Sequence, residues 1–207
     1  MNEKFFDLKK EKQDRMINAA LKVFALNGYR HASTDDIVRE AAISKGLLFH
    51  YFENKLGVYA FVRYLLLELS TAVDAKETDL FTLMQQVETG KMHAMCGYPY
   101  LQPFLNRAQA ENVNEALVAV EERKQQMEEA YENIYARADL GKYAAAEDVV
   151  KLRKMMELTI KGLMNERILE DAFQPEMLYE EILEYLQLSR RLAERSGQPS
   201  DEEITEK

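Results

Sequence analysis

The 207-residue chain contains few of the residues that interrupt helices, with only 4 Pro and 8 Gly. The long stretches between them are rich in Ala, Leu, Glu, Lys, Arg, Met and Gln, which have the best helix propensities. Hydrophobic residues make up 47% and charged residues 30% of the sequence, a balance that argues against wholesale disorder. These features predict an all-α protein.

Cysteine is nearly absent as well. The chain has 1 Cys, Cys96, so it cannot form an internal disulfide, which is typical of reducing compartments. We interpret Cys96 as a buried, small apolar residue. The N-terminal residues lack the apolar core of a secretory signal, and the most apolar segment, YAFVRYLLLEL, is too short to span a bilayer. We therefore expect a cytoplasmic protein without a membrane segment.

The sequence also lacks the residue patterns that are typical of catalytic sites. His31, His50 and His93 are scattered, without the spacing of metal ligands, and no Gly-rich phosphate loop is present. Neighbouring glutamates such as Glu121 and Glu122 are typical of solvated helix faces. We expect no enzymatic activity, no metal site and no cofactor.

Charge is distributed unevenly along the chain. Residues 1–60 hold 10 Lys and Arg against 8 Asp and Glu, while the remaining residues hold 17 against 28. The overall charge of −9 therefore resides in the C-terminal part. Such asymmetry indicates two parts of the chain with different functions. The small excess of basic residues near the N-terminus is a weak indication of nucleic-acid binding.

The first part of the chain predicts one long helix, at about residues 8–27. Ile17, Ala20, Leu21 and Phe24 follow the spacing of a single buried helix face. Gly28 stands in the position that commonly ends a helix.

Two short helices are predicted next, at residues 34–41 and 45–52. Ser33 and Ser44 precede them in N-cap position. The turn between them contains Ala42 rather than Gly, so we expect it to avoid positive φ. A long helix followed by two short helices has the outline of a helix-turn-helix, although two helices of an ordinary bundle would look similar.

The helix at residues 45–52 divides into two faces. Leu48 and Phe52, four residues apart, are expected to pack on Leu21, Phe24 and Ile37. Gly46, Leu47 and His50 then point outward, with Lys45, Phe49 and Tyr51 on the flanks. In a DNA major groove, Leu47 would contact thymine methyl groups and His50 a base edge or a phosphate. Lys45 and Lys55 would bind phosphates, as would backbone N–H groups at the helix starts near Ser33 and Asn54.

Further helices are predicted to the end of the chain, with breaks at Gly90, at Gly97–Pro99, at Gly141 and at Pro175. We place them at about residues 55–75, 78–90, 99–109, 112–138, 145–170 and 175–195. The chain thus divides into residues 1–55, which contain the possible helix-turn-helix, residues 56–197, and an acidic tail at residues 198–207.

Met and aromatic residues are concentrated between residues 78 and 135. Met fills irregular gaps and Tyr combines an apolar wall with a polar tip, so this region is a candidate pocket for a small apolar or amphipathic effector. An ordinary helical core would use the same residues. The candidate pocket residues are Phe81, Met84, Met95, Tyr98, Tyr100, Phe104, Met127, Tyr131 and Tyr135.

The last two long helices carry broad apolar faces. The first contains Val149, Met156 and Ile160, and the second contains Ile182 and Leu186. Such faces suit packing within one chain on one side and against a second copy on the other.

At this point the sequence resembles a known family. RMINAALKVFALNGY followed by ASTDDIVREAAISKGLLFHYFENK is similar to the DNA-binding domain of the tetracycline-repressor (TetR) family of bacterial regulators, over about residues 12–62. The resemblance implies a three-helix bundle with a helix-turn-helix for DNA binding in residues 1–55, joined to a helical domain for effector binding and dimerisation in residues 56–197. It also implies a homodimer, formed through the last two long helices, that binds a palindromic operator on double-stranded DNA.

The sequence departs from the family pattern at four positions. Ala32 and Leu47 stand where the family often has Thr, Phe49 where it often has Tyr, and Ala42 where it usually has Gly. The expected DNA contacts are therefore assigned to Ser33, Lys45, Gly46, Leu47, His50, Tyr51 and Lys55.

The sequence thus predicts a ligand-responsive, dimeric transcriptional regulator, a repressor in the simplest interpretation. One alternative is a helical small-molecule carrier or sequestering protein with a vestigial helix-turn-helix. A second is an all-α enzyme with its site in the Met- and Tyr-rich region.

Overall fold

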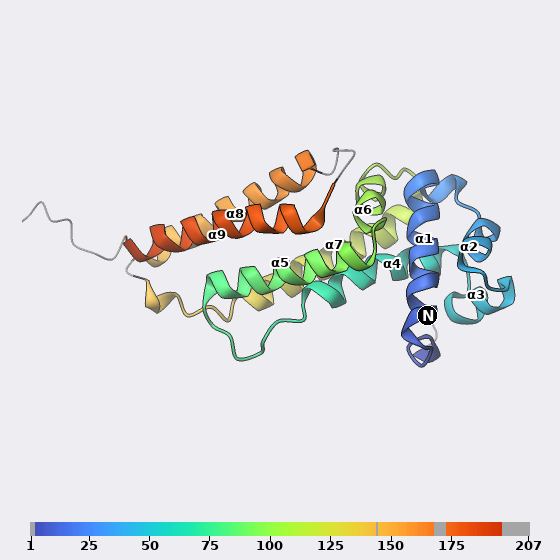
Figure 1. The fold of residues 1–207 in the computed structure, drawn as a ribbon, viewed down its shortest axis with the longest axis horizontal. Helices are drawn as coiled ribbons and strands as arrows, with labels where there is room; N and C mark the ends of the chain where they lie inside the picture. The colour runs from blue at the N-terminus through green and yellow to red at the C-terminus, as the bar shows by residue number, and fades with distance from the viewer. Residues whose placement is uncertain (1–2, 144, 168–172, 196–207) are drawn as a thin grey trace, which may run out of the picture. The chain divides into compact units, whose positions relative to one another are not determined.

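A computed structural model of the chain describes residues 3–143, 145–167 and 173–195 (Figure 1). Within these ranges every regular element is a helix, which confirms the predicted all-α class. The chain forms two compact units: residues up to 72 together with 89–133, and residues 73–88 together with those from 134 onward. These are units of packing. The predicted division into DNA-binding and effector domains concerns function and stays a prediction.

The first unit contains the N-terminal helices. Its elements are η1 (Glu3–Phe5), α1 (Lys10–His31), α2 (Thr34–Ala41), α3 (Lys45–Phe52), α4 (Lys55–Ser70), residues 89–97 of α5 (Leu80–Gly97), α6 (Leu101–Gln109) and residues 114–133 of α7 (Asn114–Tyr135). The bounds of α2 and α3 confirm the prediction. α4 ends before the predicted residue 75.

The predicted break at Gly90 is wrong, because α5 continues through it to Gly97. Val87 and Ala94 on this helix are buried, so packing compensates for the modest cost of one Gly inside a helix. Cys96 near the end of α5 is exposed, which corrects the interpretation of a buried residue.

The long first helix is interrupted where the sequence predicts its end. Gly28 has φ 66° and ψ 173°, outside the helical region and accessible to Gly at little cost. The backbone N–H of Ala32 donates to the Gly28 carbonyl oxygen at 3.1 Å. We call residues Gly28–Ala32 the 28–32 turn; it leads directly to α2.

Side-chain caps begin both short helices. Ser33 Oγ accepts the N–H of Asp35 at 3.1 Å, and Ser44 Oγ accepts the N–H of Leu47 at 3.2 Å. Each bond satisfies a backbone donor that the first turn of a helix leaves free. These contacts confirm the two predicted N-caps.

Ala42 adopts the conformation that the sequence was expected to avoid. Its φ is 51° and its ψ is 50°, in the left-handed region, and its N–H donates to the carbonyl of Arg39. The expectation was wrong because the turn between α2 and α3 is short, and the left-handed cap at the end of α2 is needed whichever residue occupies it. For a residue with a Cβ, this conformation costs about 1–2 kcal/mol.

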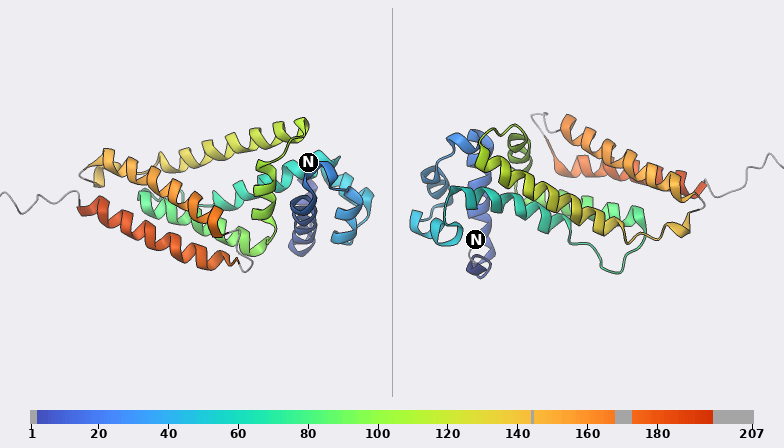
Figure 2. Two further views of the ribbon diagram at one scale, coloured as in Figure 1. Left: turned by 90° about the horizontal axis from the view of Figure 1, so that it is seen from above. Right: turned by 180° about the vertical axis from the view of Figure 1, so that it is seen from behind.

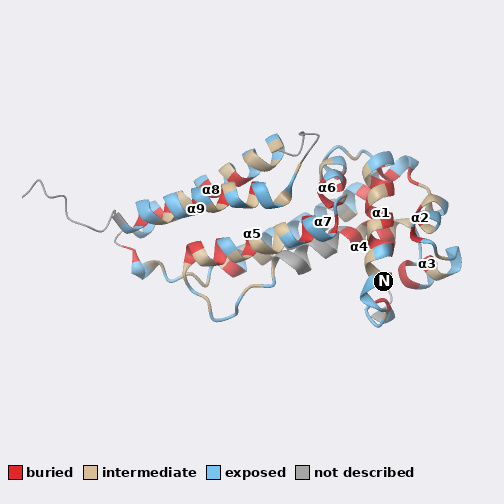
Figure 3. Ribbon diagram, in the orientation of Figure 1, coloured by how far each residue is buried: buried red, intermediate tan, exposed pale blue. Residues whose placement is uncertain are grey.

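An apolar core lies behind the two short helices (Figure 3). It buries Leu48 and Phe52 of α3 together with the three residues predicted to receive them, Leu21, Phe24 and Ile37. Isolated helices of this length are marginal in water, so this burial holds α3 in place.

Phe5 is a member of this core that the sequence analysis missed. It is 0% exposed, and its ring lies 5.6 Å from the ring of Tyr51 and 5.1 Å from that of Phe52. The only indication in the sequence is a pair of Phe residues within a charged N-terminal segment. η1 therefore packs against the end of α3.

The junction between α3 and α4 is unusually tight. Glu53 has φ 62° and ψ −50°, and the N–H of Asn54 donates to the Phe52 carbonyl at 2.6 Å, which defines a γ-turn of the rare, strained type. Asn54 Oδ1 accepts the N–H of Gly57 at 2.8 Å. A Cβ at Gly57 would lie 2.0 Å from the Phe52 carbonyl oxygen, so this junction requires glycine.

The second unit contains residues 80–88 of α5, the end of α7, η2 (Leu140–Lys142), α8 (Ala146–Arg167) and α9 (Pro175–Arg195). Helices α8 and α9 lie side by side (Figure 2). Their buried residues include Val149, Met156 and Ile160 of α8 and Ile182 and Leu186 of α9. Across the part of the chain that the structure describes, no helix has the length and apolarity to cross a membrane.

Candidate nucleic-acid interface

The outer face of α3 is open. Lys45, Gly46 and His50 are exposed, and Leu47 is half buried, with part of its side chain against the core. A Cβ built on Gly46 meets no atom within 4 Å, so the backbone here is directly accessible to a bound molecule. α3 therefore presents a cation, an imidazole and bare backbone on one face.

Lys45 already has a partner. Its ammonium nitrogen lies 2.8 Å from Asp35 Oδ1 of α2, and both side chains are largely exposed. Exposed ion pairs of this kind contribute about 0–1 kcal/mol, so the pair can open at little cost. Lys45 is thus available to a phosphate, and Asp35 is its competitor.

The N-terminus of α2 is less open than predicted from Ser33 alone. The hydroxyl of Ser33 is used as the cap, and Asp35 and Asp36 occupy the first turn. Asp36 is in turn ion-paired with Arg39. The first turn of α2 therefore carries two carboxylates of its own chain, while contacts of Ser33 with DNA stay a prediction.

Two predicted contact residues do not lie on the open face. Tyr51 is 7% exposed, and its ring packs edge-on against that of Phe5. Lys55 is half buried, and its Nζ donates to the carbonyl oxygens of Tyr29 at 2.8 Å and Ala32 at 3.2 Å. DNA contacts from these two residues stay predictions.

The 28–32 turn is also held by the connection between α6 and α7. The N–H of Tyr29 donates to Glu111 Oε2 at 3.0 Å, and its hydroxyl donates to Glu115 Oε1 at 2.6 Å. Sequence reasoning missed these carboxylates, because they are distant in the chain and look like ordinary solvated glutamates. They join α7 directly to the entrance of the helix-turn-helix.

Electrostatics at this turn follow from burial and hydrogen bonding. Burial raises the pKa of the Tyr29 hydroxyl, and the negative charges of Glu115 and Glu111 raise it further. For Glu111, burial acts to raise the pKa, but N–H donors from Asn112, Tyr29 and Val113, with the charge of Arg107, lower it overall. Glu111 is therefore an anion and Tyr29 a neutral donor at neutral pH.

The nine predicted pocket residues do not share one environment. Tyr98 and Phe104 are buried in the core behind α3, whereas Phe81 and Met84 are buried in the core of α8 and α9. The Tyr98 hydroxyl donates to Asp14 at 2.5 Å. A cavity of about 330 Å³ in the second unit is lined by residues at the end of α8 and start of α9, and by none of the nine. An effector site at these residues stays a prediction.

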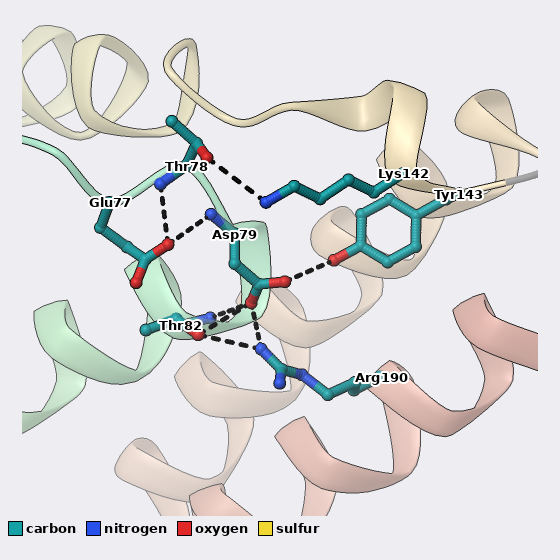
Figure 4. Close-up of polar contacts among 7 residues, drawn as sticks. All are labelled: Glu77, Thr78, Asp79, Thr82, Lys142, Tyr143 and Arg190. Carbon is teal, nitrogen blue, oxygen red and sulfur yellow. Dashed lines mark hydrogen bonds and ion pairs between the residues drawn. The ribbon is translucent and has the colours of Figure 1, made fainter.

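The second unit contains a cluster of polar side chains centred on Asp79 (Figure 4). Asp79 Oδ1 accepts the N–H of Thr82 at 2.8 Å and thereby caps α5, Oδ2 accepts the Tyr143 hydroxyl at 3.1 Å, and Arg190 of α9 forms an ion pair with the carboxylate. Burial acts to raise the pKa of Asp79, but the Thr82 bonds and the charge of Arg190 lower it overall. Burial, with the charge of Asp79, raises the pKa of Tyr143 to about 12. Each group has a partner, so the cluster is explained as structural.

The described residues contain no group of three or more His, Cys, Asp and Glu arranged to hold a metal ion. The arrangement that remains is a capped, eight-residue α3 with an open face, fixed by α1 and α2. This arrangement defines the class of helix-turn-helix domains.

Comparison with known proteins finds a family model that matches the N-terminal segment. Residues 16–60 match the family model described as bacterial regulatory proteins, tetR family. Over these residues the chain is similar to the regulators of the TetR family.

The similar regulators share the N-terminal segment. YuxN, an uncharacterized HTH-type transcriptional regulator of Bacillus subtilis, is 46% identical over 46 residues, which cover 22% of this chain and 16% of YuxN. TtgW, an uncharacterized HTH-type transcriptional regulator of Pseudomonas putida, is 41% identical over 49 residues, covering 24% of this chain and 37% of TtgW. The matches thus span less than half of either relative.

Solved structures share the fold over most of the chain. A tetR family transcription regulator from a Shewanella species aligns with a TM-score of 0.53 at 16% identity, covering 91% of this chain and 98% of that one. PfmR, a TetR family transcriptional regulator from Thermus thermophilus, aligns with a TM-score of 0.52 at 17% identity, covering 84% of this chain and 97% of PfmR. At such identities the likeness shows the fold alone.

Proposed function

We propose that this chain is a ligand-responsive transcriptional regulator of the cytoplasm, which represses by binding a palindromic operator as a homodimer. The observation that carries the proposal is the open face of α3, where Lys45, Gly46 and His50 are exposed on a helix fixed from behind. A helix held in this way can enter a DNA major groove with its contact residues already positioned.

The proposed DNA contacts divide into two kinds. Gly46 allows the backbone to approach the duplex, and Leu47 and His50 read base edges. Lys45 neutralises a phosphate after leaving Asp35, and the N-terminus of α2 near Ser33 contributes backbone donors. The phosphate contacts give affinity, and the base contacts give sequence preference.

A homodimer is proposed because a palindromic operator needs a two-fold symmetric protein. The proposed dimer surface is formed by exposed apolar residues on the last two helices, which are separate from the buried ones between them. Tyr185, Leu188 and Leu192 follow a helical spacing on α9, and Met155 and Leu158 lie on α8; all five are exposed in one copy. Burial of this surface against a second copy would remove it from water.

Ligand response is proposed as linkage. A small apolar or amphipathic effector would bind one dimer geometry better than the other and would thereby change the affinity for the operator. By linkage, operator binding changes the affinity for the effector by the same factor. The nine Met and aromatic residues from Phe81 to Tyr135 stay the candidates for contacts with this effector, divided between the two cores. A ligand with equal affinity for both geometries would not regulate.

The experiment uses duplex DNA selected from a random library by the wild-type protein. Lys45→Ala combined with His50→Ala is expected to abolish binding in fluorescence anisotropy, while the melting temperature and the oligomeric state stay unchanged. Lys124→Ala combined with His93→Ala removes the same residue types from other exposed positions and should bind like wild type. Normal binding by the first double variant would show that the wrong face was assigned.

The alternatives make different predictions. A carrier protein with a vestigial helix-turn-helix would bind a small molecule but show no palindromic footprint and no affinity that falls with rising salt. An enzyme would retain turnover when residues 1–52 are deleted. Selection of a palindromic sequence by the wild-type protein would decide against both.

A further inference from the structure

Lys55 occupies a position that connects three parts of the first unit. It is the first residue of α4 and follows the γ-turn that ends α3. Its ammonium group bonds the carbonyl oxygens of Tyr29 and Ala32, near the beginning and at the end of the 28–32 turn. The same group lies 4.4 Å from the centre of the Tyr29 ring.

These contacts occupy two of the three donors of the ammonium group and place its charge over an aromatic face. Hydrogen bonds from a charged donor to backbone carbonyls are among the stronger ones in proteins. The Tyr29 carbonyl belongs to the last turn of α1 and the Ala32 carbonyl to its C-cap residue, and this segment leads into α2. The side chain that the sequence assigns to a DNA phosphate is thus bonded to its own chain.

The 28–32 turn is held from a second direction by Glu111. Glu111 Oε2 accepts the Tyr29 N–H, while Oε1 accepts the N–H groups of Asn112 and Val113 at 2.9 and 3.0 Å. Lys55 therefore bonds the carbonyl oxygen of Tyr29, and Glu111 bonds the N–H of the same residue. Tyr29 lies between a cation from α4 and an anion from the α6–α7 connection.

We propose that Lys55 is a positioning residue: together with Glu111 it fixes the 28–32 turn, and through that turn it sets the placement of α2 and α3 for DNA binding, without contacting DNA itself. The effect on DNA rests on the proposed function. The effect on the turn does not, because it concerns the protein without DNA.

The first test measures amide hydrogen exchange in the DNA-free, full-length protein. Lys55→Met removes the donors and the charge but keeps a chain of similar length. It is expected to accelerate exchange of the Tyr29 and Ala32 amides, which donate to Glu111 and Gly28, at least about tenfold. Lys124→Met, which removes an exposed Lys on α7, is the matched control and should leave both amides protected. Unchanged exchange in Lys55→Met would overturn the proposal.

The second test separates positioning from a phosphate contact. Binding to the selected duplex is measured between about 50 and 200 mM salt. Loss of one phosphate contact reduces the slope of log affinity against log salt by about 0.9. Lys55→Met is expected to lower the affinity about tenfold with the slope unchanged, whereas Lys45→Met should reduce the slope. A reduced slope for Lys55→Met, with normal exchange, would assign Lys55 to a phosphate.

Two further variants keep the outcome decisive. Lys55→Gln, which loses the charge but keeps an N–H donor group, replaces Lys55→Met in both tests if the latter does not fold by circular dichroism. Glu111→Gln should accelerate exchange at Tyr29 and combine less than additively with the Lys55 change, because both hold one turn. If wild-type protein binds no DNA, the proposed function fails, and the exchange data alone decide on Lys55.

Discussion

Two glycine-to-alanine substitutions in the first unit should have opposite effects on stability. In Gly57→Ala the new Cβ would lie 2.0 Å from the Phe52 carbonyl oxygen, closer than non-bonded atoms approach. The clash is with backbone and not with a flexible side chain, so the α3–α4 junction must open. Overpacking of this kind costs about 3 kcal/mol, from which about 1 kcal/mol is recovered by the better helix propensity of Ala.

Gly46→Ala is the matched change, because its Cβ meets no atom within 4 Å and only the gain in helix propensity remains. Thermal unfolding followed by circular dichroism should therefore show Gly57→Ala melting about 4–8 °C below wild type and Gly46→Ala about 2–4 °C above it. Equal melting of Gly57→Ala and wild type would refute the steric reasoning at this junction. Destabilisation by Gly46→Ala would refute the open face.

Three further predictions concern single residues. Ala42→Gly should raise the unfolding free energy by about 0.5–1 kcal/mol, since relief of the left-handed conformation exceeds the added chain entropy; lower stability in urea unfolding would contradict the strain. Asp35→Asn should leave melting unchanged and raise DNA affinity about threefold in anisotropy, because it removes the competitor of Lys45; weaker binding would mean that the ion pair orients Lys45. Because folding lowers the pKa of Asp79 from its ordinary value of 3.8, the ionised carboxylate stabilises the folded protein at pH values above 3.8. This stabilisation is lost as the pH falls through the pKa that Asp79 has in the folded protein. Between about pH 5 and pH 3, the free energy of unfolding in urea should therefore fall less for Asp79→Asn, which retains a capping side chain, than for wild type. An equal fall in both proteins would count against this role of Asp79.

The N-terminal helices were predictable because their determinants are local. Ser33 and Ser44 lie next to the helices that they cap, and the spacing of Leu48 and Phe52 defines the buried side of α3 within two turns. Helix bounds followed from these residues alone. The exposure of Lys45, Gly46 and His50 followed from the position of the buried face, but the partial burial of Leu47 and the burial of Tyr51 did not.

Features fixed by distant or backbone contacts were not predictable. Nothing near Glu111 in the sequence indicates that it accepts the N–H of Tyr29, and nothing near Lys55 indicates that its charge is turned to the carbonyls of the 28–32 turn. The conformation of Ala42 was predicted wrongly because the prediction considered only the preference of Ala for negative φ. It did not consider that the short turn between α2 and α3 requires a left-handed residue at this position. The continuity of α5 through Gly90 was missed because a glycine in the sequence does not show how well its neighbours are buried.

The burial of Phe5 has a practical consequence for anyone shortening this protein. A version that starts at Lys10, where α1 begins, would appear complete by its helix boundaries. It would nevertheless leave an empty space the size of a phenyl ring beside Phe52, at the base of the helix proposed to enter DNA. Loss of binding in such a shortened form would then report a damaged interior, and should not be read as a missing N-terminal contact with the duplex.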